Sequence, residues 1–255
     1  MTLNLPEIVS RDEWLAARRE LLAKEKRFTR ERDALNADRR RLPMVEIDKP
    51  YVFHGPQGEL SLVDLFEGRS QLVVYHFMWL YDRDLGCPSC SGFADQIGNL
   101  VHLNVRDTTF ACISNAPIEK IEAFKARMGW TFPWYSSYGS DFNYDFHVTL
   151  DESRVPFEYN YRTKAEIEAA GLPVNDWEQP FDLHGMSVFL RDGARAFHTY
   201  SAYARGTDQV GFTSQLLDLT PLGRQEEWEE PKGRATAFGA PAGSVGVRYH
   251  DEYDT

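Results

Sequence analysis

Two long apolar runs stand out against the more mixed pattern of hydrophobic and polar positions along the chain. Residues 72–79 are almost continuously apolar, and residues 108–114 form a second run rich in β-branched side chains. Runs of this kind are typical of strands that are covered on both faces. Helical patterns follow each run, at 91–103 and after Pro117. The order strand, helix, strand, helix predicts a parallel sheet with right-handed crossovers.

Antiparallel hairpins are predicted on either side of this α/β core. The turn Gly55-Pro56-Gln57-Gly58 joins two apolar runs, a pattern typical of a hairpin. Asp192-Gly193 separates two alternating runs within 185–204, which is a strong short-range hairpin signal. Residues 151–182 have no clean period, so we interpret them as an insertion before the final hairpin. A last helix is predicted at 213–219.

The N-terminal residues 10–42 predict one long helix. Ser10 is its candidate N-cap, Glu13 completes a capping-box pattern, and Pro43 ends it. Because the remaining positions are dense in charged residues, we expect a solvated helix that lies along the domain. An arm that pairs two copies of the chain in a homodimer is the alternative.

These patterns predict three parts: an N-terminal helical arm over 1–43, an α/β domain over 44–220 and a C-terminal tail over 221–255. The chain has 255 residues, of which 42% are hydrophobic and 13% aromatic, enough for a sizeable core. The tail is rich in Glu, Gly and Pro, so we expect it to be loosely ordered. The aromatic residues at its very end indicate that the end docks back onto the domain.

Charge and hydropathy exclude several classes of function. The net charge is −11, which argues against binding to nucleic acid or to an anionic membrane, because both attract basic surfaces. No apolar stretch reaches the roughly 18 to 20 residues that span a bilayer. The N-terminus lacks a signal-peptide pattern. We therefore expect a cytoplasmic protein.

The candidate chemistry is a dithiol, Cys87-Pro88-Ser89-Cys90, at the junction of the first apolar run and the helix after it. In a reducing compartment such a pair indicates redox activity or metal binding rather than a permanent disulfide. The nucleophile must be a thiolate, and a helix N-terminus lowers the thiol pKa from about 8.5. Our hypothesis makes Cys87 the more exposed nucleophile and Cys90 the resolving thiol. Asp82 and Asp84 nearby would oppose thiolate formation, and Arg83 would favour it.

Several histidines, one further cysteine and one arginine are candidates for supporting groups. Cys112, between Ala and Ile, is expected to be an inert core thiol. His76 is expected to be buried, neutral and bonded to backbone, with a proton relay to the cysteines as the alternative. His184 is a candidate proton donor or substrate contact, and Arg205 is a candidate for stabilising an anion or thiolate. The aromatic segment 130–146 is interpreted as a packed loop over the sheet, with the wall of a binding site as the alternative.

The order of elements is that of a thioredoxin fold, and the chain resembles a bacterial thioredoxin-like family known as domain-of-unknown-function family 899, with peroxiredoxin-like relatives. The segments that carry this resemblance are VSRDEWLAARRELLAKEK, VVYHFMW, GCPSCSGFAD, HLNVRDTTF, RMGWTFPWYSSYGSDFNYDF, SVFLRDG, FHTYSAYARG and LLDLTPLGR. The resemblance implies a thioredoxin-like α/β fold with a central mixed sheet flanked by helices. It also implies that Cys87 and Cys90 match the two cysteines of a thioredoxin-type motif.

The sequence departs from familiar relatives at three places. Gly86, rather than Trp, precedes Cys87, and His184-Gly185-Met186 occupies the place of the cis-proline of thioredoxins. Asp84 stands where peroxiredoxins carry a Thr. These departures weigh against ordinary protein-disulfide reduction and against a standard peroxidase site.

The function that we expect is thiol-disulfide exchange or a related thiol-dependent reduction. Its substrate would be a protein or small-molecule disulfide or a peroxide, and no cofactor is expected. A non-enzymatic interaction protein that keeps the thioredoxin fold is one alternative. A metal site is the other, although the chain has one CxxC pair where a structural zinc site needs four ligands.

Overall fold

A computed structural model describes residues 6–171, 174, 177–221, 224, 226–230 and 247–253 of the chain. Most of the predicted tail, at 231–246, lies outside the described residues. The helices and strands are α1 (Arg11–Arg39), β1 (Val45–Ile47), β2 (Val52–Gly55), β3 (Gly58–Ser61), the 3-10 helix η1 (Asp64–Phe66), β4 (Gln71–His76), β5 (Trp79–Leu80), β6 (Leu85–Gly86), α2 (Pro88–Ala94), α3 (Val101–Asn104), β7 (Thr108–Ser114), α4 (Ile118–Arg127), β8 (Trp134–Ser136), α5 (Phe142–Asp145), β9 (Thr149–Leu150), β10 (Glu158–Tyr159), β11 (Arg162–Thr163), α6 (Lys164–Ala169), β12 (Phe181–Asp182), β13 (Gly185–Asp192), β14 (Arg195–Tyr203), η3 (Ala204–Val210), α7 (Phe212–Leu217) and η4 (His250–Glu252).

The chain divides into two compact units. The first consists of Met1–Pro43 and Leu216–Gly246, and the second of Met44–Gln215 and Val247–Thr255. In the first unit α1 begins at the predicted N-cap Ser10, and the capping box with Glu13 is present. None of the α1 residues is buried, in keeping with their predicted solvation. Across the part of the chain that the structure describes, no helix is both long and apolar enough to cross a membrane.

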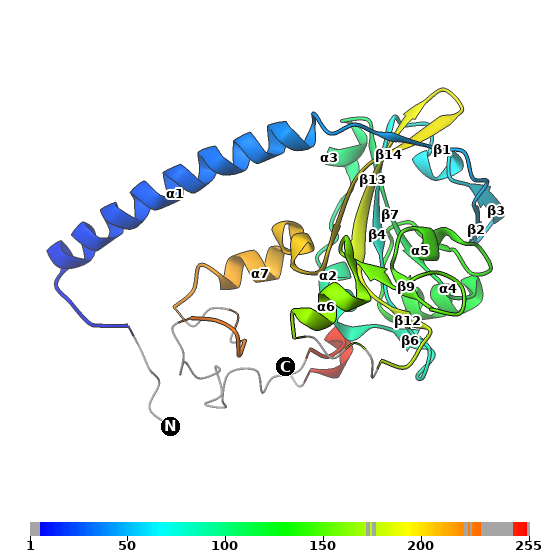
Figure 1. The fold of residues 1–255 in the computed structure, drawn as a ribbon. Coiled ribbons are helices and arrows are strands. Elements are labelled where there is room, and N and C mark those ends of the chain that lie inside the picture. The colour runs from blue at the N-terminus through cyan, green and yellow to red at the C-terminus, as the bar shows by residue number, and fades with distance from the viewer. Residues whose placement is uncertain are drawn as a thin grey trace. The chain divides into compact units, whose positions relative to one another are not determined.

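The second unit is built on an eight-stranded mixed sheet in the order β1-β14-β13-β4-β7-β8-β2-β3 (Figure 1). The strands β4, β7 and β8 are parallel, as the alternation of strands and helices predicted. The final hairpin β13–β14 is antiparallel and lies beside β4. The hairpin β2–β3 forms at the predicted Gly-Pro-Gln-Gly turn. The fold is thioredoxin-like, and the predicted insertion over 151–182 carries β10, β11, α6 and β12.

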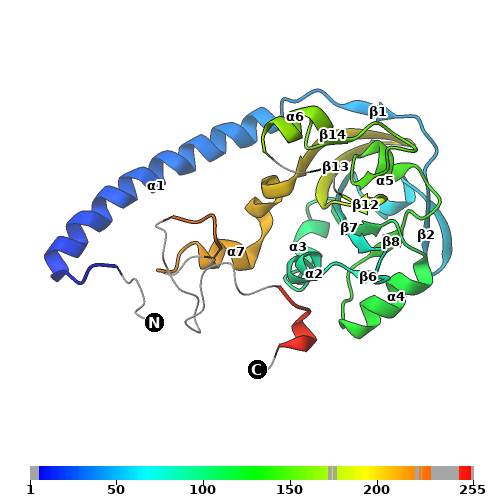
Figure 2. The same ribbon diagram turned by 60° about the horizontal axis from the view of Figure 1, so that its bottom comes forward.

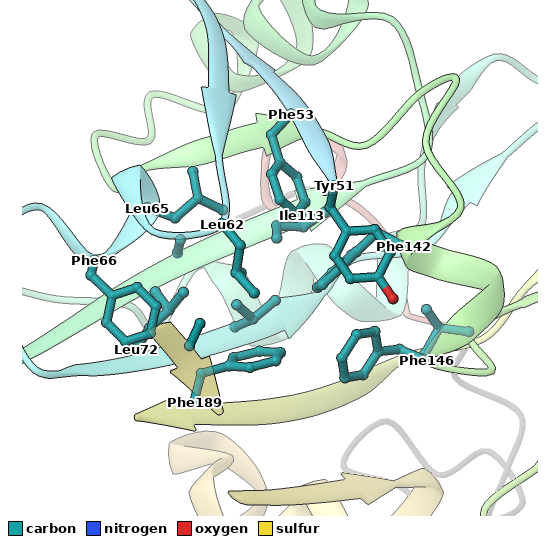
Figure 3. Close-up of a cluster of buried hydrophobic side chains, with 14 of the residues drawn as sticks. Tyr51, Phe53, Leu62, Leu65, Phe66, Leu72, Ile113, Phe142, Phe146 and Phe189 are labelled. Carbon is teal, nitrogen blue, oxygen red and sulfur yellow. The ribbon is translucent and has the colours of Figure 1, made fainter. Parts of the chain in front are cut away.

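Side chains of one strand face alternately to the two sides of this sheet, and each side is sealed by its own apolar cluster. The first cluster, which we call the far-side cluster, takes Leu72 and Val74 from β4 and Ala111 and Ile113 from β7. Rings from β2, α5 and β13 complete it, and the centroids of the Phe142 and Phe53 rings are 4.9 Å apart (Figure 3).

The opposite cluster contains the cysteines, and we call it the dithiol cluster. It takes Tyr75 from β4 and Cys112 from β7, the residues that alternate with those of the far-side cluster. Helices α2 and α4 cover it with Ala94, Ile121 and Phe124. The dithiol therefore lies in the layer that these two helices cover on one face of the sheet.

The predicted helix over 91–103 is wrong in its extent. Helix α2 begins three residues earlier, at Pro88, and ends at Ala94, and a separate short helix α3 starts only at Val101. Gly98 and Asn99 lie in the break, and the Asn99 side chain accepts a hydrogen bond from the Val101 N–H at 2.9 Å. Glycine is unfavourable in a helix interior, and the Asn side chain competes for backbone N–H groups. The first helix therefore ends before these residues and a second helix begins after them.

The aromatic segment 130–146 is also more regular than predicted. Its residues 134–136 form β8, at the end of the parallel part of the sheet, and 142–145 form α5. Trp134 and Phe132 enter the dithiol cluster, whereas Phe142 and Phe146 enter the far-side cluster. The segment thus packs on the sheet, as predicted, but it does so partly as a strand of that sheet.

Candidate active site

A short hairpin after β4 delivers the dithiol to the start of α2. The strands β5 and β6 pair antiparallel around the charged residues 82–84, and the Cys87 N–H donates to the carbonyl of Met78 at 3.1 Å. Cys87 is the N-cap residue of α2, and Pro88 occupies its first turn. Proline suits that position because its fixed φ matches the helix and its missing N–H has no intrahelical partner.

Both thiols of the motif are buried, although to different extents. Cys87 is 7% exposed and Cys90 is 2% exposed, and both are free cysteines. The order matches our hypothesis, but even Cys87 is a buried residue. Cys112 is fully buried, and its burial raises the pKa of its thiol well above the usual range, which fits the prediction of a neutral core thiol.

The pKa values of the two motif thiols are shifted in opposite directions. A hydrogen bond from the Cys90 thiol, with further donors from the Ser89 and Cys90 backbone, lowers the pKa of Cys87 to about 6 against the opposing effect of burial. Burial raises the pKa of Cys90 well above its usual value, and its hydrogen bond to Cys87 adds to this. Near pH 7 the pair therefore holds one thiolate, on Cys87, and one proton, on Cys90.

Tyr75 shares the dithiol cluster with the resolving cysteine, Cys90. Its side chain hydrogen-bonds to Cys90, an interaction that favours the Cys90 thiolate, and its ring packs on Phe93 with centroids 4.3 Å apart. Burial, and then the Cys90 charge, raise the pKa of Tyr75 well above its usual value. Tyr75 is thus a permanent hydrogen-bond donor at physiological pH.

A buried carboxyl group, Asp182 on β12, lies beside the same hairpin. It accepts hydrogen bonds from the Trp79 N–H at 3.0 Å, the Tyr81 hydroxyl at 2.8 Å and the Thr149 hydroxyl at 2.6 Å. Burial raises the pKa of Asp182 to about 6, the three donors oppose this, and the negative charge of Cys87 adds to it. Asp182 and Cys87 therefore ionise over the same pH range and affect each other.

Comparison with known proteins supports the resemblance noted in the sequence. A family model described as a bacterial protein of unknown function, DUF899, matches residues 3–253. The chain belongs to the DUF899 family. Among curated proteins, none matches it.

Solved structures similar to this DUF899 protein include peroxiredoxins and a putative protein disulfide isomerase, by their descriptions. A PrxQ variant of Xylella fastidiosa is 14% identical, with 66% of this chain and 89% of that chain covered at a TM-score of 0.40. Peroxidoxin BcpB of Mycobacterium tuberculosis is 12% identical, with 69% and 96% covered at a TM-score of 0.42. The mitochondrial 2-Cys peroxiredoxin of Plasmodium falciparum is 10% identical, with 70% and 92% covered at a TM-score of 0.39. Similarity at this level says nothing about the substrate of the DUF899 protein.

Close packing explains the glycine that precedes the dithiol in this DUF899 protein. A Cβ on Gly86 would lie 2.6 Å from the Phe124 ring and 2.9 Å from the Phe77 ring. The Gly86 backbone is therefore pressed between aromatic side chains, and a bulkier residue would force them apart. At the second departure, a Cβ on Gly185 would meet the Tyr203 ring at 2.6 Å.

The charged turn before the motif is electrostatically balanced. Asp84 accepts hydrogen bonds from Lys120 and from the Trp79 indole N–H, and these partners, Lys120 first, lower its pKa. Arg83 pairs with Asp82 at 3.5 Å, with both side chains exposed. Lys120 therefore offsets the effect that Asp84 was predicted to have on the thiolate. Arg83, which was predicted to favour the thiolate, pairs with Asp82 instead.

The two supporting candidates after the insertion bond to groups near the end of β14. The His184 imidazole pairs with the Ala204 carbonyl at 3.3 Å, and burial lowers its pKa. Arg205 pairs with Asp208 at 3.2 Å and its side chain is exposed. Neither contact involves a cysteine, so roles for His184 and Arg205 in the chemistry stay predictions.

His76 faces away from the dithiol, into the far-side cluster. It is buried, and burial lowers its pKa to about 3, so the predicted neutral form is confirmed. The predicted backbone partner is wrong: the His76 Nε2 pairs with the Ser187 hydroxyl at 2.7 Å. That hydroxyl continues to Ser201 and then His198, each step 2.7 Å. Successive residues of a strand point to opposite faces of the sheet, so His76 cannot face the dithiol together with Tyr75.

Sequence reasoning missed three residues of this site: Tyr75, Asp182 and Tyr249. Tyr249 joins the dithiol cluster from the end of the chain, as the aromatic residues there predicted, but its target was not foreseen. The one signal for Asp182 was a lone acidic residue between Phe181 and Leu183 in a segment that we interpreted as irregular. In the described ranges, no group of three or more His, Cys, Asp or Glu side chains is arranged to hold a metal ion.

Proposed function

We propose that this protein is a thiol-disulfide oxidoreductase in which Cys87 is the nucleophile and Cys90 the resolving thiol. The observation that carries the proposal is the position of Cys87 at the N-cap of α2, with Cys90 buried in the first turn of the same helix; hydrogen-bond donors from Cys90 and Ser89 lower the pKa of Cys87 to about 6. Such donors stabilise a thiolate, and a thiol with a pKa near or below ambient pH is both ionised and nucleophilic. The neutral Cys90 thiol beside it is placed to attack second.

The chemistry conserves atoms and electrons in two steps. The Cys87 thiolate attacks one sulfur of a substrate disulfide, forms a mixed disulfide and releases the other sulfur as a thiolate. Cys90 gives its proton to that released thiolate and attacks the Cys87 sulfur, which expels the second substrate thiolate. Two electrons pass from the dithiol to the substrate, and the protein is left with a Cys87–Cys90 disulfide. An external dithiol reductant must then restore the reduced form.

A peroxide is the other oxidant that this pair could meet. The Cys87 thiolate would attack the O–O bond and become a sulfenic acid, and the alkoxide or hydroxide that leaves would take a proton from water. The Cys90 thiol would then condense with the sulfenic acid to form the same disulfide and one molecule of water. The position of the peroxiredoxin Thr holds Asp84, which is paired with Lys120 and Trp79. That arrangement favours a disulfide over a peroxide as the substrate.

The test compares three single variants for reduction of a small aromatic disulfide and of hydrogen peroxide. We expect Cys87→Ser to lose about 100-fold or more in rate, because it removes the nucleophile. We expect Cys90→Ser to retain the first step and to accumulate a mixed disulfide that mass spectrometry detects at Cys87. Cys112→Ser is the matched control, because Cys112 is a buried thiol in the same cluster, and it should react like the parent.

Two results would refute the proposal. Unchanged disulfide reduction by Cys87→Ser would show that Cys87 is not the nucleophile. A Cys87 thiol that titrates near pH 9 and resists both oxidants would instead favour a non-enzymatic interaction protein with a thioredoxin fold.

A further inference from the structure

The segment 247–253 packs on the dithiol cluster through Tyr249. Tyr249 is 6% exposed and donates its hydroxyl to the Gly86 carbonyl at 2.6 Å, across 163 residues of sequence. Gly86 directly precedes Cys87, and the charge of Cys87 acts on Tyr249. The phenol ring packs edge-on against Phe124, with centroids 5.6 Å apart. One aromatic side chain of the tail thus covers the backbone that presents the nucleophile.

Contacts on both sides of Tyr249 hold this segment in place. Arg127 on α4 makes a two-pronged ion pair with Asp251, each bond 2.8 Å long, and its guanidinium lies 4.7 Å from the Tyr249 ring centroid. His250 pairs with Asp95 at the end of α2 at 2.7 Å. The segment 247–253 therefore bridges the C-terminal ends of α2 and α4, and Figure 2 shows its last turn, in red, below α2.

These anchoring side chains are partly exposed to solvent, unlike the interior of the dithiol cluster. The side chains of Arg127, Asp251 and His250 are roughly one-third to one-half exposed. Ion pairs at such exposure contribute little to stability, so the burial of Tyr249 is the main interaction that keeps the segment closed. A segment held by one buried ring and several exposed pairs belongs to the part of a structure that opens at low free energy.

We propose that residues 247–253 form a lid that closes over Cys87 and must open before a substrate reaches the thiolate. The site beneath is complete while the lid is closed, since the hydrogen bonds to the Cys87 sulfur come from Cys90 and Ser89. Opening the lid would therefore change access to Cys87 and leave its donors in place. The value of such a lid for catalysis rests on the proposed function, but the closure itself does not.

The experiment measures how fast iodoacetamide alkylates Cys87 in full-length protein, with mass spectrometry to identify the modified cysteine. The reaction is run at about pH 8.5, where a thiol with a pKa of about 6 is fully ionised. At that pH a change in rate reports access rather than ionisation. We expect Tyr249→Ala to raise the rate about tenfold, because alkylation of a buried group follows its opening equilibrium.

Two further variants keep the test independent of a folding defect. Arg127→Gln removes the ion pair to Asp251 and leaves Tyr249 intact, and we expect a smaller rise, of about twofold to threefold. Arg195→Gln is the matched control, because Arg195 makes a similar two-pronged pair with Glu46, each bond 2.7 Å long, at the β1–β14 edge. It should leave the rate unchanged. Circular dichroism and the unfolding midpoint confirm that each variant is folded.

The outcomes separate the lid from the proposed function. A rate in folded Tyr249→Ala that stays within about twofold of the parent, or an equal rise in Arg195→Gln, overturns the lid. Faster alkylation of Cys87 in the lid variants with no reduction of a small disulfide by any of them leaves the lid standing and refutes the proposed function.

Discussion

The dithiol cluster and the far-side cluster bury similar numbers of side chains against opposite faces of one sheet, but they differ in the polar groups that they contain. In the dithiol cluster, sulfur, phenol and carboxyl groups meet: Cys87, Cys90, Tyr75 and the neighbouring Asp182. In the far-side cluster the polar groups form a chain from His76 through two serine hydroxyls to His198. The first set holds a charge near neutral pH, and the second stays neutral.

This difference shows how one strand serves two purposes. Tyr75 and His76 are successive, fully covered residues of β4, and the pleat sends one to each face. The far side excludes charge, as the lowered pKa of His76 indicates. The dithiol side stabilises one thiolate with directed donors. The sheet therefore separates a stabilising layer from a layer that can carry out chemistry.

The largest expected effect comes from removing a buried aromatic ring from the far-side cluster. Phe142 is fully buried and contacts the rings of Tyr51, Phe53 and Phe146. We expect Phe142→Ala to lower the free energy of unfolding by about 3 to 5 kcal/mol, measured by urea denaturation. If the two faces are independent, the pKa of Cys87 in the folded variant should not move. The matched variant Phe124→Ala, in the dithiol cluster, should change both quantities, and a shift of the Cys87 pKa in Phe142→Ala would refute the separation.

Acid should weaken the far side through His76. Its pKa falls from 6.5 to about 3 on folding because burial disfavours the charged ring. A lowered folded pKa gives stability that is present above pH 6.5 and is lost as the pH falls towards 3. Between pH 7 and pH 5 we expect His76 to account for a loss of about 2 kcal/mol in the free energy of unfolding.

Urea midpoints at several pH values, for the parent and for His76→Gln, test this dependence. The variant should be less stable at pH 7 and should have a flatter profile down to pH 5. Asp182 acts with the opposite sign, because its raised pKa gives stability below its unfolded pKa that is lost as the pH rises through about 6. Parallel profiles for parent and variant would contradict the role given to His76.

On the dithiol side, Asp182→Asn should make the Cys87 thiolate easier to form. The carboxylate and the thiolate repel each other, so its removal should lower the pKa of Cys87 below about 6. Absorbance at 240 nm, which reports thiolate, should show more than half of Cys87 ionised at about pH 6. The loss of a hydrogen-bond acceptor should cost about 1 to 3 kcal/mol of stability. A raised Cys87 pKa would show that Asp182 acts through structure rather than charge.

The smallest effect is expected at the exposed turn. Lys120→Gln removes the main partner of Asp84, yet the Lys120 and Asp84 side chains are both about half exposed and water screens their charges. We expect the pKa of Cys87, followed by absorbance at about 240 nm, and the unfolding midpoint to stay within experimental error of the parent. A raised pKa of Cys87 would mean that Asp84, once unpaired, does oppose the thiolate as first predicted.

Much of the scaffold could be predicted because its signals are local. The strand 108–114 coincides with β7 and the turn at Asp192-Gly193 joins β13 to β14, since apolar runs and turn residues act within a few positions. The capping box at Ser10 is equally local. The dithiol was placed correctly between strand and helix for the same reason.

The surroundings of the dithiol could not be predicted, because they come from distant parts of the chain. Asp182 reaches the Trp79 N–H across 103 residues, and Tyr249 reaches Gly86 across 163. No period or spacing in the sequence encodes such meetings. The error at 91–103 arose differently: the apolar positions continue through Gly98 and Asn99, but the local preferences of these two residues override that pattern.

The alternation along β4 has a consequence for inherited variation in this family. A substitution at Tyr75 or His76 alters one face of the sheet and leaves the other intact. An insertion or deletion of one residue between Gln71 and His76 would turn every following side chain of the strand to the wrong face. It would bring an imidazole to the sulfurs and a phenol into the chain of serines in a single event. The length of this segment should therefore vary less among relatives than the identity of any residue within it.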